Sequence, residues 1–295
     1  MAEFAIFNFI SGQIDRSLIS TVTNRVEQIS AFAEKPVTAM MLMYFVIYGW
    51  MILKGAAQEP ISELLKRSLK LAVIWYLIVN PLIFMDNFGN FLLVILPRDI
   101  IQAITGLSGD NSIDLFVRHG FRTATKLWEQ ADWYEIGTML LVAFIYIVAI
   151  LAGCVAFVIF AMSNISVAML LILAPIFISL LMFQATSRWF WGWISAAVTF
   201  VILKVLLVAL LTLMNEVAAK IISSATGWEL IVTGWNIIIV YFIGFFIFFK
   251  LYDIAAAIGG GVSTNVTQYV NSTYRVYSSY QQRRATRVLN QSQAG

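Results

Sequence analysis

The sequence predicts an all-α polytopic integral membrane protein, a bundle of five to six transmembrane helices with an amphipathic helix at the N-terminus. The chain is 60% hydrophobic and 12% charged, with a mean hydropathy of +0.84, which excludes an ordinary soluble or disordered protein. Residues 136–187 contain no Asp, Glu, Lys, Arg or His. A single helix of that length would measure about 78 Å, which is enough to cross a hydrocarbon core of roughly 30 Å twice.

A polar cluster inside this uncharged stretch is the place where we expect the chain to turn. Ser163, Asn164 and Ser166 interrupt an otherwise apolar run. Two spans, 136–162 and 167–183, would then lie on either side of the connection.

Residues 1–35 predict an amphipathic helix that does not cross the membrane. Apolar side chains recur at steps of three and four residues, namely Phe7, Ile10, Ile14, Leu18, Val22, Val26, Ile29 and Phe32. Charged residues lie between them, including Asp15, Arg16 and Arg25. The helix is expected either to lie along the membrane surface or to pack its apolar stripe on another subunit.

Residues 36–85 are expected to hold the first membrane segments. Residues 36–53 form an uncharged span that begins at Pro36, a residue suited to a first helical position. A basic loop follows, and then the short apolar segment 71–85, which is interrupted by Asn80 and Pro81. Because proline breaks or kinks a helix, this segment predicts either a short span or a re-entrant piece.

Residues 86–135 form a polar region in which a helix is expected over residues 112–130, after a turn at residues 106–111. The membrane bundle is expected over residues 136–262, where residues 193–214 and 230–249 predict two further spans. Arg188, Trp189, Trp191 and Trp193 have the composition of an aromatic belt at the level of the lipid headgroups. Gly259, Gly260 and Gly261 favour close helix packing or a hinge.

Lys204 is the most informative single residue, since it lies near the middle of a predicted span. A charge at that depth costs at least about 2.5–3.5 kcal/mol on insertion scales. Lys204 is therefore expected to face other helices, a subunit interface or a wet lumen, unless the span is shifted so that the lysine lies near its end.

The tail, residues 263–295, carries Arg275, Arg283, Arg284 and Arg287 and no acidic residue. By the positive-inside rule this places the C-terminus in the cytoplasm. The same tail, with its interleaved tyrosines, is also compatible with binding anionic lipid, nucleic acid or an acidic partner.

Catalysis finds little support in the sequence. Its single histidine, His119, has no cysteine beside it, and we find no metal-ligand cluster and no nucleophile motif. We therefore expect no enzyme activity, no cofactor and no bound metal.

Several segments resemble a known family. Leu173-Ala174-Pro175-Ile176-Phe177 is followed by Leu181-Met182-Phe183, by Thr186-Ser187-Arg188 and by Trp193. With the order of apolar and polar segments, this pattern is similar to the TrbL-like family, the polytopic inner-membrane subunits of type IV secretion and conjugation systems. The resemblance covers about residues 36–262.

The resemblance implies a non-enzymatic scaffold or channel component of the bacterial inner (cytoplasmic) membrane. Such a subunit helps to translocate DNA or protein and to assemble a pilus or stalk. Its expected partners are other secretion-system subunits, further copies of itself and the bilayer. The resemblance also implies a periplasmic N-terminus and a periplasmic 86–135 region, which requires an odd number of crossings, whereas six apolar segments are counted. A stand-alone secondary transporter that uses Lys204 is the alternative.

Overall fold

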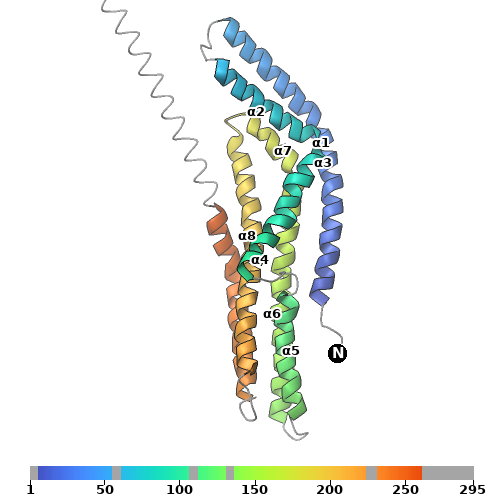
Figure 1. The fold of residues 1–295 in the computed structure, drawn as a ribbon, viewed down its shortest axis with the longest axis vertical. Helices are drawn as coiled ribbons and strands as arrows, with labels where there is room; N and C mark the ends of the chain where they lie inside the picture. Colours follow the sequence, from blue (N-terminus) through green and yellow to red (C-terminus); the bar gives the residue numbers. More distant parts are fainter. Residues whose placement is uncertain (1–5, 55–60, 106–111, 131–135, 224–230, 261–295) are drawn as a thin grey trace, which may run out of the picture.

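The computed structural model describes residues 6–54, 61–105, 112–130, 136–223 and 231–260, and these are arranged as a bundle of helices (Figure 1). Within these ranges every regular element is a helix, which confirms the all-α prediction. Among the described residues, four helices are long and apolar enough to cross a membrane, namely α1, α6, α8 and the helix Ile231–Gly260. A bent pair of helices over residues 65–104 adds a fifth candidate.

Helix α1 spans Ile6–Leu53 without interruption and contains Pro36. The boundary expected at residue 35, between the amphipathic helix and the first span, therefore lies inside one helix. The helix bends along its length, and proline is a common cause of such bends (Figure 1). Its first part packs beside α6 of the same chain, and the two placements expected for it, on the membrane surface or on another subunit, stay predictions.

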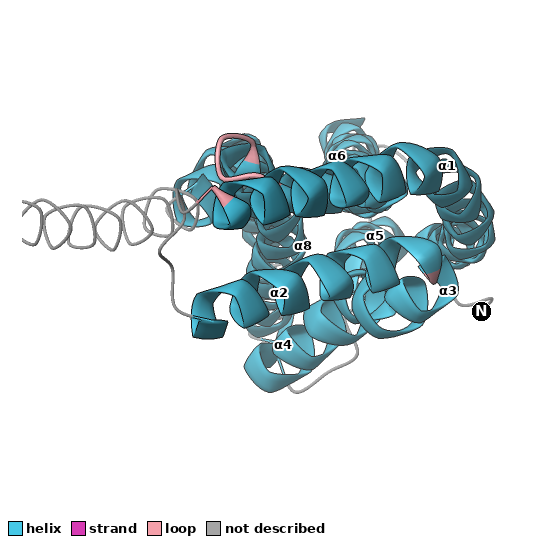
Figure 2. Cartoon of the chain, turned by 90° about the horizontal axis from the view of Figure 1, so that it is seen from above, coloured by secondary structure: helices cyan, strands magenta, loops and turns pink. Residues whose placement is uncertain are grey.

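The second membrane segment is broken where the sequence predicts. Helix α2, Ile61–Val79, ends just before Asn80, and α3, Pro81–Phe84, begins with the proline. The chain then continues through two π-helical segments, Met85–Gly89 and Phe91–Ile95, into α4, Leu96–Thr105. The two arms of this broken helix meet at 97°, and the run continues well beyond residue 85. Figure 2 shows α2 beside α1 with α3 and α4 close by.

Helix α5, Ser112–Gln130, agrees with its predicted bounds, and α6 runs from Ile136 to Ile172. The prediction of a turn at residues 163–166 is wrong, because α6 continues through all four residues. The break falls instead at Leu173, before α7, Ala174–Ser179, where Pro175 has no backbone N–H to continue the ladder. A short 3₁₀ turn, Leu180–Met182, follows. Residues 167–183 therefore do not form a separate span.

The two remaining helices complete the bundle. Helix α8 spans Ser187–Ser223, and the last described helix is Ile231–Gly260. Helices of 37 residues such as α6 and α8 are about 55 Å long, so they are longer than the roughly 30 Å hydrocarbon core. They must tilt or extend beyond it.

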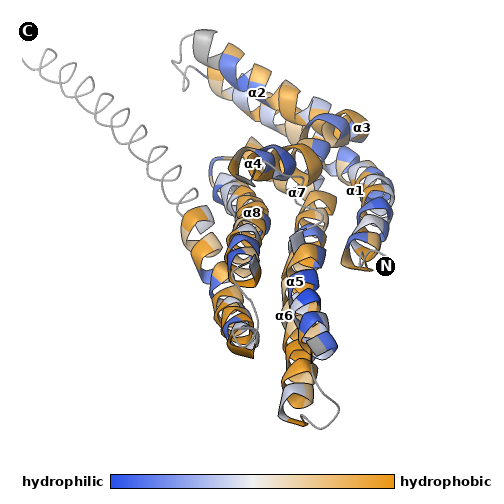
Figure 3. Ribbon diagram, turned by 60° about the horizontal axis from the view of Figure 1, so that its bottom comes forward, coloured by the Kyte–Doolittle hydropathy of each residue, from blue (hydrophilic) through white to orange (hydrophobic). Residues whose placement is uncertain are grey.

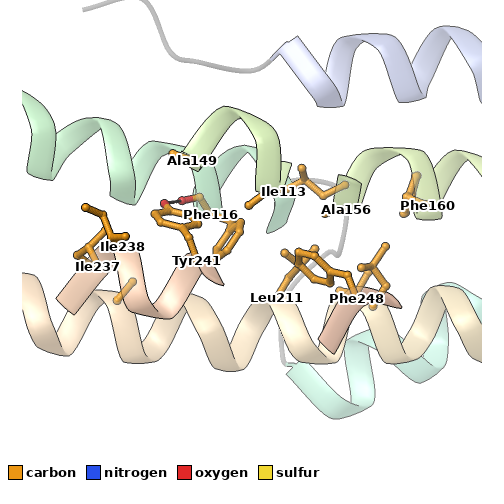
Figure 4. Packing of buried hydrophobic residues seen from close by; sticks show 14 of the residues in the cluster. Ile113, Phe116, Ala149, Ala156, Phe160, Leu211, Ile237, Ile238, Tyr241 and Phe248 are labelled. Atoms are coloured by element: carbon orange, nitrogen blue, oxygen red, sulfur yellow. Dashed lines mark hydrogen bonds between the residues drawn. The ribbon is translucent and has the colours of Figure 1, made fainter. Parts of the chain in front are cut away.

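Two clusters of buried apolar side chains hold the helices together. The larger one joins α5, α6, α8 and the last helix, and Figure 4 shows Phe116, Ala149, Leu211 and Tyr241 among its members. The smaller one joins the middle of α1, from Val22 to Val37, to α2, α3, the end of α6, α7 and the start of α8. Helix α5, which belongs to the polar region 86–135, packs directly on α6 and α8.

Candidate functional site

Lys204 lies on the side of α8 that meets α6. Its Nζ atom is 4.8 Å from the centroid of the Phe160 ring, and the side chain is half-buried. A cation over an aromatic face is favourable, and more so when the pair is shielded from water. Lys204 therefore faces protein within its own chain.

A buried polar contact joins α6 to α1 one helical turn beyond Phe160. The Asn164 side chain is 5% exposed, and its Nδ2 atom donates a hydrogen bond of 2.9 Å to Oδ1 of Asp15. Its neighbour Ser163 donates from Oγ to the carbonyl of Ile159. Two of the three polar side chains of the expected turn, Ser163 and Asn164, are thus satisfied inside a continuous helix, so they need no turn.

Asp114, at the start of α5, caps the N-terminus of α1. Its carboxylate accepts hydrogen bonds from the backbone N–H groups of Phe7, at 3.2 Å, and Asn8, at 2.8 Å. The carboxylate is almost fully buried, and the positive end of the α1 dipole favours its negative charge. An acidic residue of the polar region therefore fixes the beginning of α1 to the bundle.

Tyr241 ties the last helix to α5. Its hydroxyl donates to the carbonyl of Phe116 and accepts from the N–H of Gly120 at 2.8 Å (Figure 4). A Cβ atom at Gly120 would lie 2.7 Å from both Tyr241 Oη and Ala149 Cβ. Gly120 thus has no space for a side chain at the point where three helices meet.

The aromatic belt is divided between the surface and the core. Trp189 is exposed, and the guanidinium of Arg188 lies 5.8 Å from its ring centroid. Trp191 is half-buried beside Phe190. Trp193 departs from the expectation, because it is 3% exposed and its indole N–H donates to the Leu170 carbonyl at 2.9 Å.

Gly259 lies against α8. Its carbonyl accepts a hydrogen bond from Ser195 Oγ at 2.6 Å, and a Cβ atom there would lie 2.9 Å from the Cα of Thr199. At Gly260 a Cβ atom would meet nothing within 4 Å. Gly261 and the tail arginines, Arg275, Arg283, Arg284 and Arg287, lie outside the described residues.

His119 of α5 is partly buried between two arginines of its own helix. Burial lowers the pKa of its imidazole, and the charges of Arg122 and Arg118 lower the pKa further, so the ring is neutral at pH 7. In the described part of the chain, no group of three or more His, Cys, Asp and Glu side chains is placed to hold a metal ion.

Three of these contacts could not be found from the sequence: the Asp114 cap, the Asp15–Asn164 pair and the Tyr241 bridge. Each joins residues more than a hundred positions apart. Local periodicity carries no signal for such pairs.

The fold and these contacts define a multi-pass helical membrane protein whose polar residues mainly join helices to one another. The model of the family described as TrbL/VirB6 plasmid conjugal transfer protein matches residues 41–251, and the chain belongs to this family. It is also similar to the type IV secretion system protein VirB6 of Bartonella henselae and to that of Bartonella quintana. Each is 25% identical over 265 residues, which are 88% of this chain and 81% of the relative.

Membership confirms the resemblance seen in the sequence. The protein is a component of a type IV secretion or conjugation system and a multi-pass protein of the bacterial inner membrane. Its partners are therefore other subunits of such a system.

Proposed function

We propose that this protein is a scaffold and channel component that lines part of the path for DNA or protein and supports assembly of the pilus or stalk. The observation that carries this proposal is the position of α5. Figure 3 shows this helix, which carries many hydrophilic residues, lying along the apolar α6. Helix α6 contains no charged residue.

The two faces of α5 differ sharply. Phe116, Val117 and Ala124 are fully buried against the neighbouring helices. Arg122 and Lys126 are exposed on the other face. Charged side chains next to membrane-spanning helices need water, protein partners or a wet cavity. In an assembled complex, the exposed face of α5 would border an aqueous path that suits a polar substrate such as DNA or an unfolded polypeptide.

Several copies are needed to enclose such a path, and α1 offers a surface for contacts between copies. A groove of about 400 Å³ between α1 and α6 is lined by apolar and polar side chains together, including Phe9, Gln13, Ser17 and Ile165. Phe9 is 69% exposed. A mixed surface of this kind suits a protein neighbour better than lipid tails, which cannot pair with the polar groups. We propose that this side contacts the next copy in a homo-oligomeric ring.

The topology that fits this role has the N-terminus and α5 on the periplasmic side and the C-terminal tail in the cytoplasm. Five crossing segments place the two ends on opposite sides, as the family resemblance implies. The end of α1, the start of α2 and the start of α8 lie toward one end of the molecule in Figure 1. Lys54, Lys66, Arg67 and Arg188 belong to these segments, so basic residues gather at the proposed cytoplasmic end.

One experiment separates this role from a stand-alone transporter. After mild-detergent extraction from cells that express the whole secretion system, native mass measurement should show several copies bound to other secretion subunits. A lone monomer or dimer that takes up solute when reconstituted in liposomes would favour the transporter instead.

Lys204 offers a second comparison. We propose that it serves assembly or export through its contact with α6, so Lys204→Leu should lower conjugal transfer, with protein levels in the membrane measured in parallel. Lys250→Leu is the matched control, because Lys250 is exposed and pairs only with nearby Asp253, at 3.3 Å, among the contacts described. Unchanged transfer with Lys204→Leu would reject the role.

A further inference from the structure

A groove of about 500 Å³ lies between α2, α3, α7 and α8, and its described lining residues belong neither to α5 nor to the α1 groove. Its walls are apolar along most of its length. Val73 and Leu77 of α2, Phe84 of α3 and Ile178 of α7 all line it. Lys66 and Lys70, one helical turn apart on α2, are the charged residues among the described side chains that line it, and no described acidic side chain does.

Aromatic side chains form part of the wall of this groove. Trp193 lines it and is held by its hydrogen bond to the Leu170 carbonyl. The Trp193 ring stacks on Phe177, with centroids 6.0 Å apart, and contacts Phe190 at 5.6 Å. The wall of the groove is therefore built in part on a side chain that has its own partners inside the protein.

We infer that this groove binds an anionic phospholipid, with an acyl chain along the apolar walls and the phosphate at Lys66 and Lys70. The apolar walls suit an acyl chain and disfavour a free anion. The two lysine ammonium groups favour a negatively charged headgroup. Basic pockets between membrane helices bind anionic headgroups in this manner. The inference does not depend on the proposed export role.

The size of the groove argues against a helix from another protein as its occupant. A helix with side chains is about 10 Å across, so about one turn of it would fill 500 Å³. The groove instead follows α2 from Lys66 to Leu77, about 16 Å, which suits a narrow extended chain. The neighbouring basic residue Arg67 is directed elsewhere, since its guanidinium lies 5.7 Å from the Tyr48 ring centroid.

The test uses the purified full-length protein in detergent and two lipids with identical acyl chains, phosphatidylglycerol and phosphatidylcholine. Native mass spectrometry measures how much of each stays bound. Loss of both charges in the double variant Lys66→Gln, Lys70→Gln should weaken phosphatidylglycerol binding about 30-fold and leave phosphatidylcholine unchanged. Lys54→Gln is the control, because Lys54 lies on the same hairpin and is over the Trp50 ring rather than in the groove.

A second variant tests the apolar part of the groove. Val73 is half-exposed and lines it, so Val73→Trp should fill the space without disturbing the core and should reduce retention of both lipids. The inference is overturned if the lysine variant retains phosphatidylglycerol as the natural protein does. Crosslinking of a photoreactive residue at position 73 to another protein chain in place of lipid would overturn it as well.

Discussion

The hydroxyl of Tyr241 stands between two backbone groups of α5, accepting from Gly120 N–H and donating to the Phe116 carbonyl. These two groups are four residues apart and would bond to each other directly in a regular α-helix. The ring of Tyr241 also lies 4.5 Å from that of Phe116, with an interplanar angle of 61°. One side chain of the last helix thus holds the polar helix α5 in the bundle.

Tyr241→Phe should destabilise the protein by about 1 kcal/mol, because it removes one hydrogen-bonding hydroxyl and keeps the ring. The measurement is the midpoint of unfolding in detergent. Tyr252→Phe is the control on the same helix, since Tyr252 is 47% exposed. Equal midpoints for the two variants would show that the bridge contributes nothing.

Asp114→Ala should loosen the beginning of α1. The carboxylate is the partner of two N–H groups at the start of that helix, and loss of such a cap costs about 1–2 kcal/mol. Hydrogen exchange of the amides near Phe7 and Asn8 should become faster, while exchange in the rest of the bundle changes little. Asp99→Ala, at an exposed position in the first turn of α4, should leave these amides as they are. Unchanged exchange in the Asp114 variant would rule out the cap.

The Asp15–Asn164 contact should appear as a coupling energy. In a double-mutant cycle with Asp15→Ala and Asn164→Ala, the two effects on the free energy of unfolding should fall short of additivity by about 0.6–1.7 kcal/mol, the range of hydrogen bonds between membrane helices. The double-mutant cycle separates the interaction energy of this pair from the energies of the other contacts of Asp15. Strict additivity would mean that the hydrogen bond does not join α1 to α6 in solution.

Gly259 and Gly260 form a matched pair for testing close packing. Gly259→Ala places a Cβ atom against Thr199 of α8 and should cost about 1–3 kcal/mol through overpacking. Gly260→Ala meets open space and should be neutral or slightly stabilising, since alanine favours a helix. Thermal unfolding of both variants measures the difference. A neutral Gly259→Ala would contradict the close approach.

The features that the sequence predicts correctly are those that depend on neighbouring residues in the sequence. The uncharged run of α6 follows from composition, the break at Asn80 and Pro81 follows from proline geometry, and α5 follows from its periodicity. The turn expected at residues 106–111 lies outside the described residues. The turn expected at Ser163 and Asn164 fails because Asn164 bonds to Asp15 of another helix and Ser163 bonds to a carbonyl of its own helix. Trp193 departs from the belt because Phe177 stacks on it and its indole N–H bonds to the Leu170 carbonyl. Such partners depend on tertiary packing, which local pattern does not encode.

The exposure of α5 to water tests the proposed channel role most directly. Cys154 is exposed, so the background carries Cys154→Ser, and single cysteines are then placed at Arg122 on α5 or at Phe144 on the exposed apolar side of α6. A membrane-impermeant maleimide is added to intact cells with a permeabilised outer membrane, so that the thiols are reached from the periplasm. We predict rapid labelling at position 122 and little at position 144, and we predict that a substrate caught in transit protects position 122. Labelling at position 144 equal to that at position 122, or no labelling at position 122, would contradict an aqueous path along α5.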